Sequence, residues 1–174
     1  MKENWDKAFA EVIKSEGGYV NDPHDHGGET NLGVTKKAWA EYLGRAIADG
    51  EMRALTVATV QPFYKKMYWD KVHGDDLPAG LDYAVFDFAV NAGTGRAAKF
   101  LQQAVGVTAD GAIGPGTMGA VAKADPKHAL DQFTSAKEHF YKGLVDKNPD
   151  QQKFFKGWMN RVSHVHGVAE TLMA

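Results

Sequence analysis

A glutamate at position 16 ends an amphipathic helical pattern and is followed directly by two glycines. At about 100° per residue, Trp5, Phe9 and Val12 share one arc of the predicted helix, and Glu16 projects into the same arc. Its carboxyl group is therefore expected to be partly buried. Burial and the negative end of the helix dipole both favour the protonated form, which a general acid requires. The alternative is a helix-terminal glutamate whose stem covers apolar surface while its head reaches water.

The segment after this helix, residues 17–35, is rich in turn formers, carboxylates and hydroxyls and has no helical period. It predicts a hairpin and a loop. Gly17 or Gly18 is expected to take the left-handed conformation that ends the helix. Gly27–Gly28 and Gly33 are expected to supply further positive φ angles.

The returning chain would bring Asp22, Asp25 and Thr30 near Glu16. One carboxyl group would then lie in an apolar setting and others in a hydrated one, which is the division of labour that glycoside hydrolysis needs. Histidines flank Asp25 on both sides and superficially suggest a metal site. Because no second ligand cluster accompanies them and the spacing is not that of an EF-hand, no metal is predicted.

The run Glu16-Gly-Gly-Tyr-Val-Asn-Asp-Pro-x-Asp-x-Gly-Gly-x-Thr-Asn-x-Gly-Val-Thr resembles the signature of the glycoside hydrolase family 108 muramidases. Many members are phage or prophage endolysins, and the family was once described as secretion activators. The resemblance continues through residues 68–70 and 86–93. It extends to residues 101–117, which are similar to the family's predicted peptidoglycan-binding region.

The resemblance implies a mainly α, lysozyme-like fold with a small β-hairpin element. Because no internal repeat or low-complexity linker separates the halves of the chain, the two lobes are expected to share one core. Residues 1–93 would form the catalytic lobe and residues 94–174 a helical peptidoglycan-binding lobe. The enzyme would hydrolyse the β-1,4 bond between N-acetylmuramic acid and N-acetylglucosamine in peptidoglycan glycan strands, without a cofactor. Glu16 would protonate the leaving glycosidic oxygen. Asp25, helped by Thr30, would orient the attacking water or stabilise the positive charge that develops on the sugar.

The roles of Asp25 and Thr30 follow the Glu/Asp/Thr spacing of phage-type lysozymes, whose second gap holds five residues where this chain has four. A threonine hydroxyl beside an aspartate suits the holding of a water molecule, which favours inversion at the anomeric carbon. Asp22 is the rival second carboxylate. Its place before Pro23 is equally consistent with a structural turn.

Other polar and aromatic residues of these motifs are candidates for substrate contact. Tyr19 and Asn31 lie in the motif loop, Tyr64 lies in a predicted helix, and Asn91 falls in an Asn-x-Gly pattern. Aromatic residues at helical spacing more often belong to a core, so both interpretations of Tyr64 stay open. Asp87, four residues before Asn91, is expected in a hydrogen-bonded structural network.

Two other functions are consistent with the same motif. A lytic transglycosylase would use the same acid and let the 6-hydroxyl of the substrate attack. A non-catalytic wall-binding module or secretion-associated scaffold needs no acid, and the complete motif around Glu16 argues against it.

Composition excludes several classes of function. The 174 residues include no cysteine, so disulfides and thiolate chemistry are excluded. A formal net charge of −2 argues against nucleic-acid binding, which rests on a basic face. Neither an apolar signal segment nor a run of roughly 18 apolar residues is present, so no membrane insertion is expected. We therefore expect synthesis in the cytoplasm without a Sec signal, and the family resemblance implies action on the cell wall after release by another agent, such as a holin.

Helical periodicity recurs through the rest of the chain. Asp125-Pro126 predicts the start of a long helix, with the aspartate as N-cap, and a kink or restart is expected at Pro62. The predicted elements are a helix after the N-cap Thr35, a loop at residues 46–55, a helix over residues 56–69, a buried central helix over residues 81–91, the helix that begins at Asp125-Pro126, and a C-terminal helix over residues 155–169.

Overall fold

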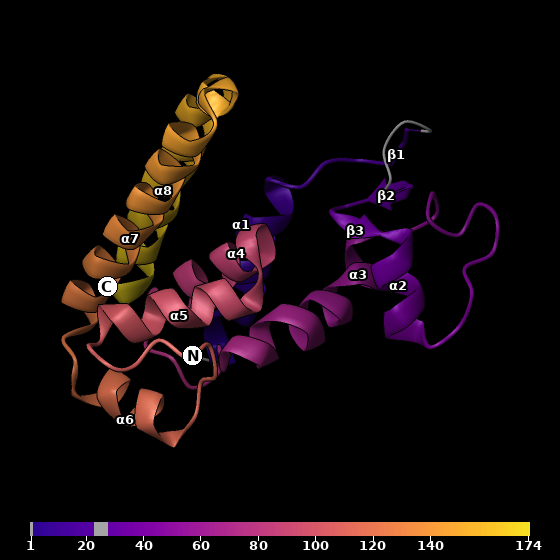
Figure 1. The fold of residues 1–174 in the computed structure, drawn as a ribbon. Coiled ribbons are helices and arrows are strands. Elements are labelled where there is room, and N and C mark those ends of the chain that lie inside the picture. The colour runs from indigo at the N-terminus through magenta and orange to yellow at the C-terminus, as the bar shows by residue number, and fades with distance from the viewer. Residues whose placement is uncertain (1, 23–27) are drawn as a thin grey trace. The chain divides into compact units, whose positions relative to one another are not determined.

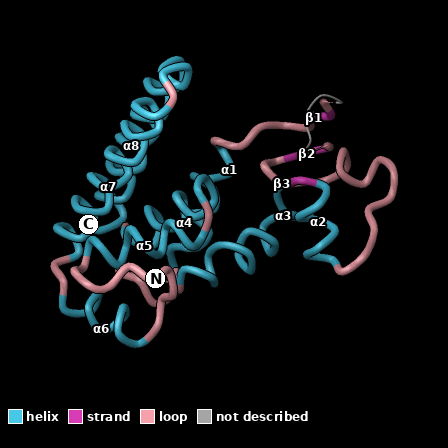
Figure 2. The backbone as a smooth tube through the Cα atoms, in the orientation of Figure 1, coloured by secondary structure: helices cyan, strands magenta, loops and turns pink. Residues whose placement is uncertain are grey.

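The computed structural model describes residues 2–22 and 28–174, in which helices dominate and short strands are confined to residues 20–35 (Figure 1, Figure 2). The mainly α fold with a small β element is confirmed. The chain forms two compact units. We call Asp6–Met67 the small unit, and residues 1–5 together with Tyr68–Ala174 the helical unit. The boundary predicted at residue 93 separates a catalytic lobe from a peptidoglycan-binding lobe. The division into compact units does not test that functional boundary.

The small unit holds the first helices and a three-stranded antiparallel sheet in the order β1-β2-β3. Thr35 caps α2 as predicted, because its hydroxyl accepts a hydrogen bond from Ala38 N at 3.1 Å. Turns form the segment at residues 46–55, as expected. The elements are α1 (Trp5–Lys14), β1 (Val20–Asn21), β2 (Glu29–Asn31), β3 (Val34–Thr35), α2 (Lys36–Leu43) and α3 (Val57–Tyr64).

A two-residue turn at Leu32 and Gly33 joins β2 to β3. Their φ angles are 51° and 76°, and positive φ at both positions is the geometry of a type I′ turn. Glycine adopts this region readily, whereas for leucine it is strained by roughly 1–2 kcal/mol. The turn sets the register, so Asn31 lies opposite Val34 and Thr30 opposite Thr35.

Aromatic side chains fill the core of the small unit. Tyr64 packs against Phe63 and Phe9 with ring centroids 5.6 Å apart in both pairs, and Trp39 packs on Phe63 at 5.8 Å. Phe9, Trp39, Phe63 and Tyr64 are all buried. Burying each such side chain contributes roughly 1.5–3 kcal/mol to folding.

Helix α3 continues through Pro62. The geometry changes three residues later, where Lys65–Trp69 form a π-helical turn. The N–H of Lys65 is shared between the carbonyls of Gln61 and Pro62, which marks the start of this irregular turn. Of the kink or restart expected at Pro62, the restart is wrong in position, because α3 continues through the proline and the helix changes geometry only at Lys65, while the kink stays a prediction.

The helical unit is built around α4, in which every residue from Leu81 to Ala89 is buried. Helix α4 packs against α5, α7 and α8, which confirms the predicted central helix. Asp125 caps α7 as predicted, because its carboxylate accepts from His128 N at 2.7 Å. The elements are α4 (Leu81–Ala92), α5 (Thr94–Ala104), α6 (Pro115–Lys123), α7 (Pro126–Lys147) and α8 (Gln152–Met173).

A buried ion cluster ties α4 to α7 and α8. Arg161 donates to Asp87 Oδ1 at 2.8 Å, and Lys137 Nζ lies 3.8 Å from Asp87 Oδ2. Burial lowers the pKa of Lys137, while the charge of Asp87 opposes that shift. The hydrogen-bonded network predicted for Asp87 is confirmed.

Gln102 on α5 holds the loop at residues 110–117, which leads into α6. Its amide nitrogen donates to Asp110 Oδ1 at 2.7 Å and to Thr117 Oγ1 at 3.1 Å, and its oxygen accepts from Gly111 N at 2.9 Å. Gln102 itself is 1% exposed, so its amide group is removed from water and the loss of its partners would be costly. One glutamine therefore holds the loop at residues 110–117.

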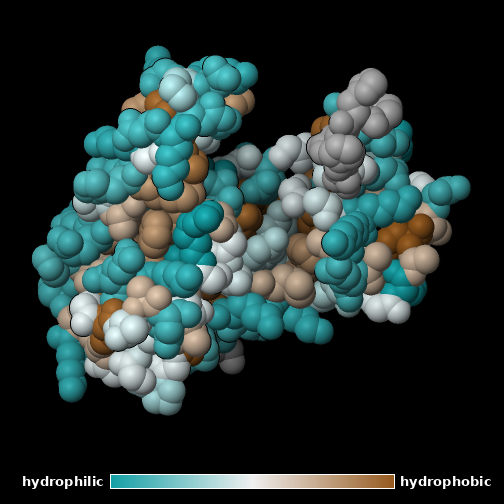
Figure 3. All heavy atoms as spheres, viewed as in Figure 1, coloured by the Kyte–Doolittle hydropathy of each residue, from teal (hydrophilic) through white to brown (hydrophobic). Residues whose placement is uncertain are grey.

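Helices α7 and α8 lie side by side and are joined by a short turn at Pro149–Gln151 (Figure 1). The face of this pair that Figure 3 shows is mainly hydrophilic. In the part of the chain that the structure describes, no helix combines the length and the apolar composition needed to cross a membrane.

Candidate active site

Glu16 follows directly after α1 and is half-buried, as the sequence predicts. Its N–H donates to the Ile13 carbonyl at 3.1 Å, and the N–H of Ser15 donates to the Val12 carbonyl at 3.0 Å. These three-residue bonds tighten the last turn of the helix. The carboxyl group of Glu16 thus lies just beyond the negative end of the α1 dipole.

The glycines of the motif follow the predictions in part. Gly28 and Gly33 have positive φ angles of 66° and 76°, which confirms the expectation for both, and Gly27 lies outside the described residues. Neither Gly17 nor Gly18 has a positive φ angle, so the predicted left-handed cap of α1 is wrong. The helix closes instead through the tight bonds of its last turn.

Gly33 lies directly against the carboxyl group of Glu16. A Cβ atom added to Gly33 would stand 2.5 Å from Glu16 Oε2 and 2.5 Å from Tyr64 Oη, a separation that real Cβ atoms essentially never show. Both oxygens therefore border the space that a side chain at position 33 would need. Only glycine fits at this position without moving the carboxyl group.

Tyr64 holds the turn in place beside Glu16. Its hydroxyl donates to the carbonyl of Leu32 at 2.7 Å, and its ring is buried against Phe9 and Phe63. The strained residue of the turn is thus tied to the rigid core by a hydrogen bond. Glu16 Oε2 and the Tyr64 hydroxyl thus both border a turn that is anchored to the core.

A second carboxylate, Glu29 on β2, is held as an anion. Lys36 Nζ lies 2.7 Å from Oε2, and the hydroxyl of Tyr19 donates to Oε1 at 2.8 Å. These bonds lower the pKa of Glu29, and the bond to Glu29 raises the pKa of Lys36. The guanidinium of Arg53 lies 4.3 Å from the centroid of the Tyr19 ring. Sequence reasoning missed this cluster, although the β2–β3 register, once the turn at residues 32–33 is placed, sets Glu29 opposite Lys36.

The other residues predicted for the site are distributed more widely. Thr30 is half-buried in the middle strand. Asn31 is buried, and its amide donates to the carbonyl of Met52 at 2.9 Å, so it ties the sheet to the turns at residues 46–55. Asp25 lies outside the described residues. Asn91 belongs to the helical unit.

The structure therefore places Glu16 and Tyr64 both beside Gly33, and Tyr19 against Glu29. The amide of Asn91 donates to the Tyr141 hydroxyl at 2.6 Å. Contact of Tyr19, Asn31, Tyr64 and Asn91 with substrate stays a prediction. The close approach of Gly33 to Glu16 was not predicted, since the sequence signals only a positive φ angle there.

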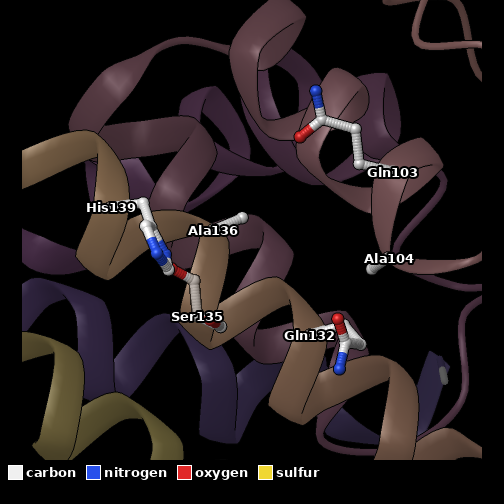
Figure 4. A pocket seen from close by; sticks show the side chains of 6 residues that line it. All are labelled: Gln103, Ala104, Gln132, Ser135, Ala136 and His139. Carbon is white, nitrogen blue, oxygen red and sulfur yellow. The ribbon is translucent and has the colours of Figure 1, made fainter. Parts of the chain in front are cut away.

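A pocket elsewhere, between α5 and α7, carries different chemistry. His139 Nδ1 lies 2.8 Å from the Ser135 carbonyl on its own helix. A glycosidase needs a carboxyl acid, which this pocket lacks among the described side chains that line it. Its lining residues are Gln103, Ala104, Gln132, Ser135, Ala136 and His139 (Figure 4). Among residues 2–22 and 28–174, no group of three or more histidines and carboxylates is arranged to hold a metal ion.

A mainly helical fold with a small antiparallel sheet, in which the first helix ends at a half-buried glutamate beside a β-turn, defines a lysozyme-like glycoside hydrolase. Comparison with known families is consistent with this class. Residues 9–93 match the family described as Glycosyl hydrolase 108, and residues 96–163 match the Predicted Peptidoglycan domain. The chain belongs to the glycosyl hydrolase 108 family and is a glycoside hydrolase that acts on peptidoglycan.

A solved structure supports the same assignment over the whole chain. The structure of Brucella abortus SagA is 40% identical in sequence and superposes with a TM-score of 0.86, and the match covers 99% of this chain and 97% of that chain. A comparison with curated proteins returned no match.

Proposed function

We propose that the protein is an N-acetylmuramidase that hydrolyses the β-1,4 bond between N-acetylmuramic acid and N-acetylglucosamine, with Glu16 as the general acid. The observation that carries this proposal is the half-buried carboxyl group of Glu16, set against Gly33 and the Tyr64 hydroxyl. Family membership supports peptidoglycan as the substrate, and the position of Glu16 supports it as the proposed acid.

In the proposed reaction Glu16 donates its proton to the glycosidic oxygen as the bond to the anomeric carbon breaks. Asp25, helped by Thr30, orients the attacking water, so that the product forms with inversion. Asp22, which is exposed after β1, is the competing second carboxylate. Tyr64 and Gly33 fix the position of the Glu16 carboxyl group from the side of the core.

Substitution of the acid tests the proposal directly. Glu16→Gln keeps the shape and removes the transferable proton, so clearance of permeabilised Gram-negative cells should fall by a factor on the order of 10² to 10⁴, with unchanged folding. Glu11→Gln is the matched control, because Glu11 is half-buried one turn earlier and is bonded to Lys14. Retention of more than about half of the activity by Glu16→Gln would remove Glu16 from the role of acid.

Product analysis separates the proposed hydrolysis from its alternatives. A muramidase releases ordinary reducing ends, whereas a lytic transglycosylase releases anhydro ends that mass spectrometry of muropeptides detects. A non-catalytic wall-binding or secretion-associated module would bind sacculi and release neither product.

The stereochemistry tests the second carboxylate. NMR of the first-formed product on a defined oligosaccharide should show α-configured new reducing ends, and Asp25→Asn should lower the rate more than Asp22→Asn. Predominantly β-configured ends would instead mean retention and would refute the water-holding role of Asp25 and Thr30.

We further propose that the enzyme is a phage or prophage endolysin that reaches the wall from the cytoplasm after a holin opens the membrane. The family resemblance supports this role. Expression of the chain alone in a Gram-negative host should leave cells intact, and co-expression with a holin should lyse them. Equal lysis with and without the holin would contradict it.

A further inference from the structure

We propose that a pocket in the helical unit binds the peptide stem of peptidoglycan through one of its carboxylates. The inference rests on the proposed function, because it concerns a second part of the same substrate. The pocket lies where the end of α4 and the start of α5 meet α7 and α8. Its lining residues are Asn91, Ala92, Arg96, Phe140, Tyr141, Leu144 and Trp158.

Arg96 supplies a positive charge that is not already neutralised. Its guanidinium carbon lies 4.5 Å from the centroid of the Phe140 ring, and its one hydrogen bond to a described residue is a long contact of 3.4 Å to the Ala92 carbonyl. Within the described ranges no carboxylate forms an ion pair with Arg96. A guanidinium oriented by a ring face keeps parallel N–H donors for a carboxylate, which it binds in a bidentate manner.

Tyr141 supplies a second donor beside this charge. Burial raises the pKa of Tyr141, so the hydroxyl stays neutral. The oxygen accepts from Asn91 Nδ2 at 2.6 Å, while the O–H proton has no acceptor among the residues that the structure describes. The nearby carboxylate of Asp87 is paired with Arg161. It therefore leaves the guanidinium of Arg96 and the hydroxyl of Tyr141 available to a ligand.

The remaining wall is apolar. Phe140, Leu144 and Trp158 line it, and the rings of Tyr141 and Trp158 stack with centroids 5.1 Å apart and planes at 25°. A cation and a hydroxyl beside such a wall match a ligand that carries both a carboxylate and small apolar groups.

The chemistry of peptidoglycan decides which part of it fits. In the glycan strand the lactyl acid of muramic acid is consumed in an amide bond, so the strand itself offers no anion for Arg96. The peptide stem carries free carboxylates and alanine methyl groups, which match the cation and the apolar wall of the pocket. The stem is therefore the occupant that the charge of the pocket favours.

Binding of a soluble stem tests the inference. The probe is the tripeptide L-alanyl-γ-D-glutamyl-meso-diaminopimelate, titrated into the full chain by calorimetry, with thermal melts to verify folding. Arg96→Gln should weaken binding about tenfold or more, and Tyr141→Phe should weaken it several-fold while keeping the ring. Lys156→Gln is the matched control: it removes the same charge from an exposed site on α8 and should change affinity less than about twofold.

Each contrary result has a distinct meaning. Absence of saturable tripeptide binding overturns the inference, whether or not the enzyme is active. Equal losses in Arg96→Gln and Lys156→Gln would show general charge attraction and overturn it as well, and so would binding of N-acetylglucosamine oligomers that depends on Arg96, because the occupant would then be glycan. Tripeptide binding that depends on Arg96 in a protein that releases no reducing ends would refute the proposed hydrolysis and leave the pocket standing.

Discussion

Gly33→Ala should reduce activity strongly because the added methyl group would collide with the carboxyl group of Glu16, the proposed general acid. The new Cβ would stand 2.5 Å from Glu16 Oε2 and from Tyr64 Oη, whereas real contacts stay beyond 3.0 Å. Both oxygens, or the backbone at residue 33, must therefore shift by at least about 0.5 Å. Misplacement of a reacting group on this scale, up to about 1 Å, costs up to about 10²-fold in rate. We expect a loss between tenfold and about 10²-fold.

Folding stability should fall in the same variant. Alanine at a φ angle of 76° costs roughly 1–2 kcal/mol, and forcing a methyl group into filled space typically costs about 1–3 kcal/mol. Gly44→Ala separates the two effects, because Gly44 has a φ angle of 69° and nothing within 4 Å of its added Cβ. It should lose stability through strain alone and keep its activity.

The assays are clearance of permeabilised Gram-negative cells, normalised to folded protein, and urea unfolding of both variants. If Gly33→Ala and Gly44→Ala lost similar stability and both kept more than half of the wild-type activity, the collision at Glu16 would have no catalytic consequence. The argument that Gly33 places the acid would then be wrong.

Three further predictions follow from the same structure. Tyr64→Phe keeps the ring and removes the bond to the Leu32 carbonyl, so it should cost about 0.5–1.5 kcal/mol and lower kcat more than it raises KM; an unchanged kcat contradicts the positioning role. A fragment of residues 1–93 should aggregate, because α4 loses the cover of α5, α7 and α8; a soluble fragment with a cooperative melt would show that this cover is dispensable. Arg45 lowers the pKa of Glu51 from 4.5 to about 2, so the bond stabilises the fold above about pH 4.5 and is lost as the pH falls toward 2; the melting-temperature gap between wild type and Glu51→Gln should shrink over that range, and a constant gap refutes the linkage.

The sequence was sufficient for features that depend on local chemistry. Thr35 and Asp125 are N-caps because a hydroxyl or carboxylate precedes a helical period, and both caps form as predicted. Leu81–Ala92 is a central helix because it is apolar on most sides. The half-burial of Glu16 follows from its angular position on α1. Each of these inferences uses only neighbours within a few turns of the same element.

Features that depend on tertiary packing could not be predicted in the same way. The helix-ending role expected of Gly17 or Gly18 fails because two tight hydrogen bonds close α1 first. The contact of Gly33 with Glu16 and Tyr64 joins three segments distant in sequence, and no periodicity encodes it. The Glu29–Lys36 pair is intermediate between local features and features of tertiary packing. A two-residue turn placed at residues 32–33 is enough to predict it.

The half-buried carboxylates of the small unit include residues that are unsuited to the role proposed for Glu16. Three of them are bonded to cations, at 2.6 Å for Glu11 to Lys14 and 2.7 Å for both Glu29 to Lys36 and Glu51 to Arg45. A cationic partner favours the anion, and the pKa values of Glu29 and Glu51 are lowered accordingly. A carboxylate held as an anion is a poor proton donor, so these three are unsuited to protonate a glycosidic oxygen. Glu16 follows the C-terminal end of α1 and lies against Gly33, a position where the helix dipole opposes the anion, and this is consistent with the general-acid role proposed for it.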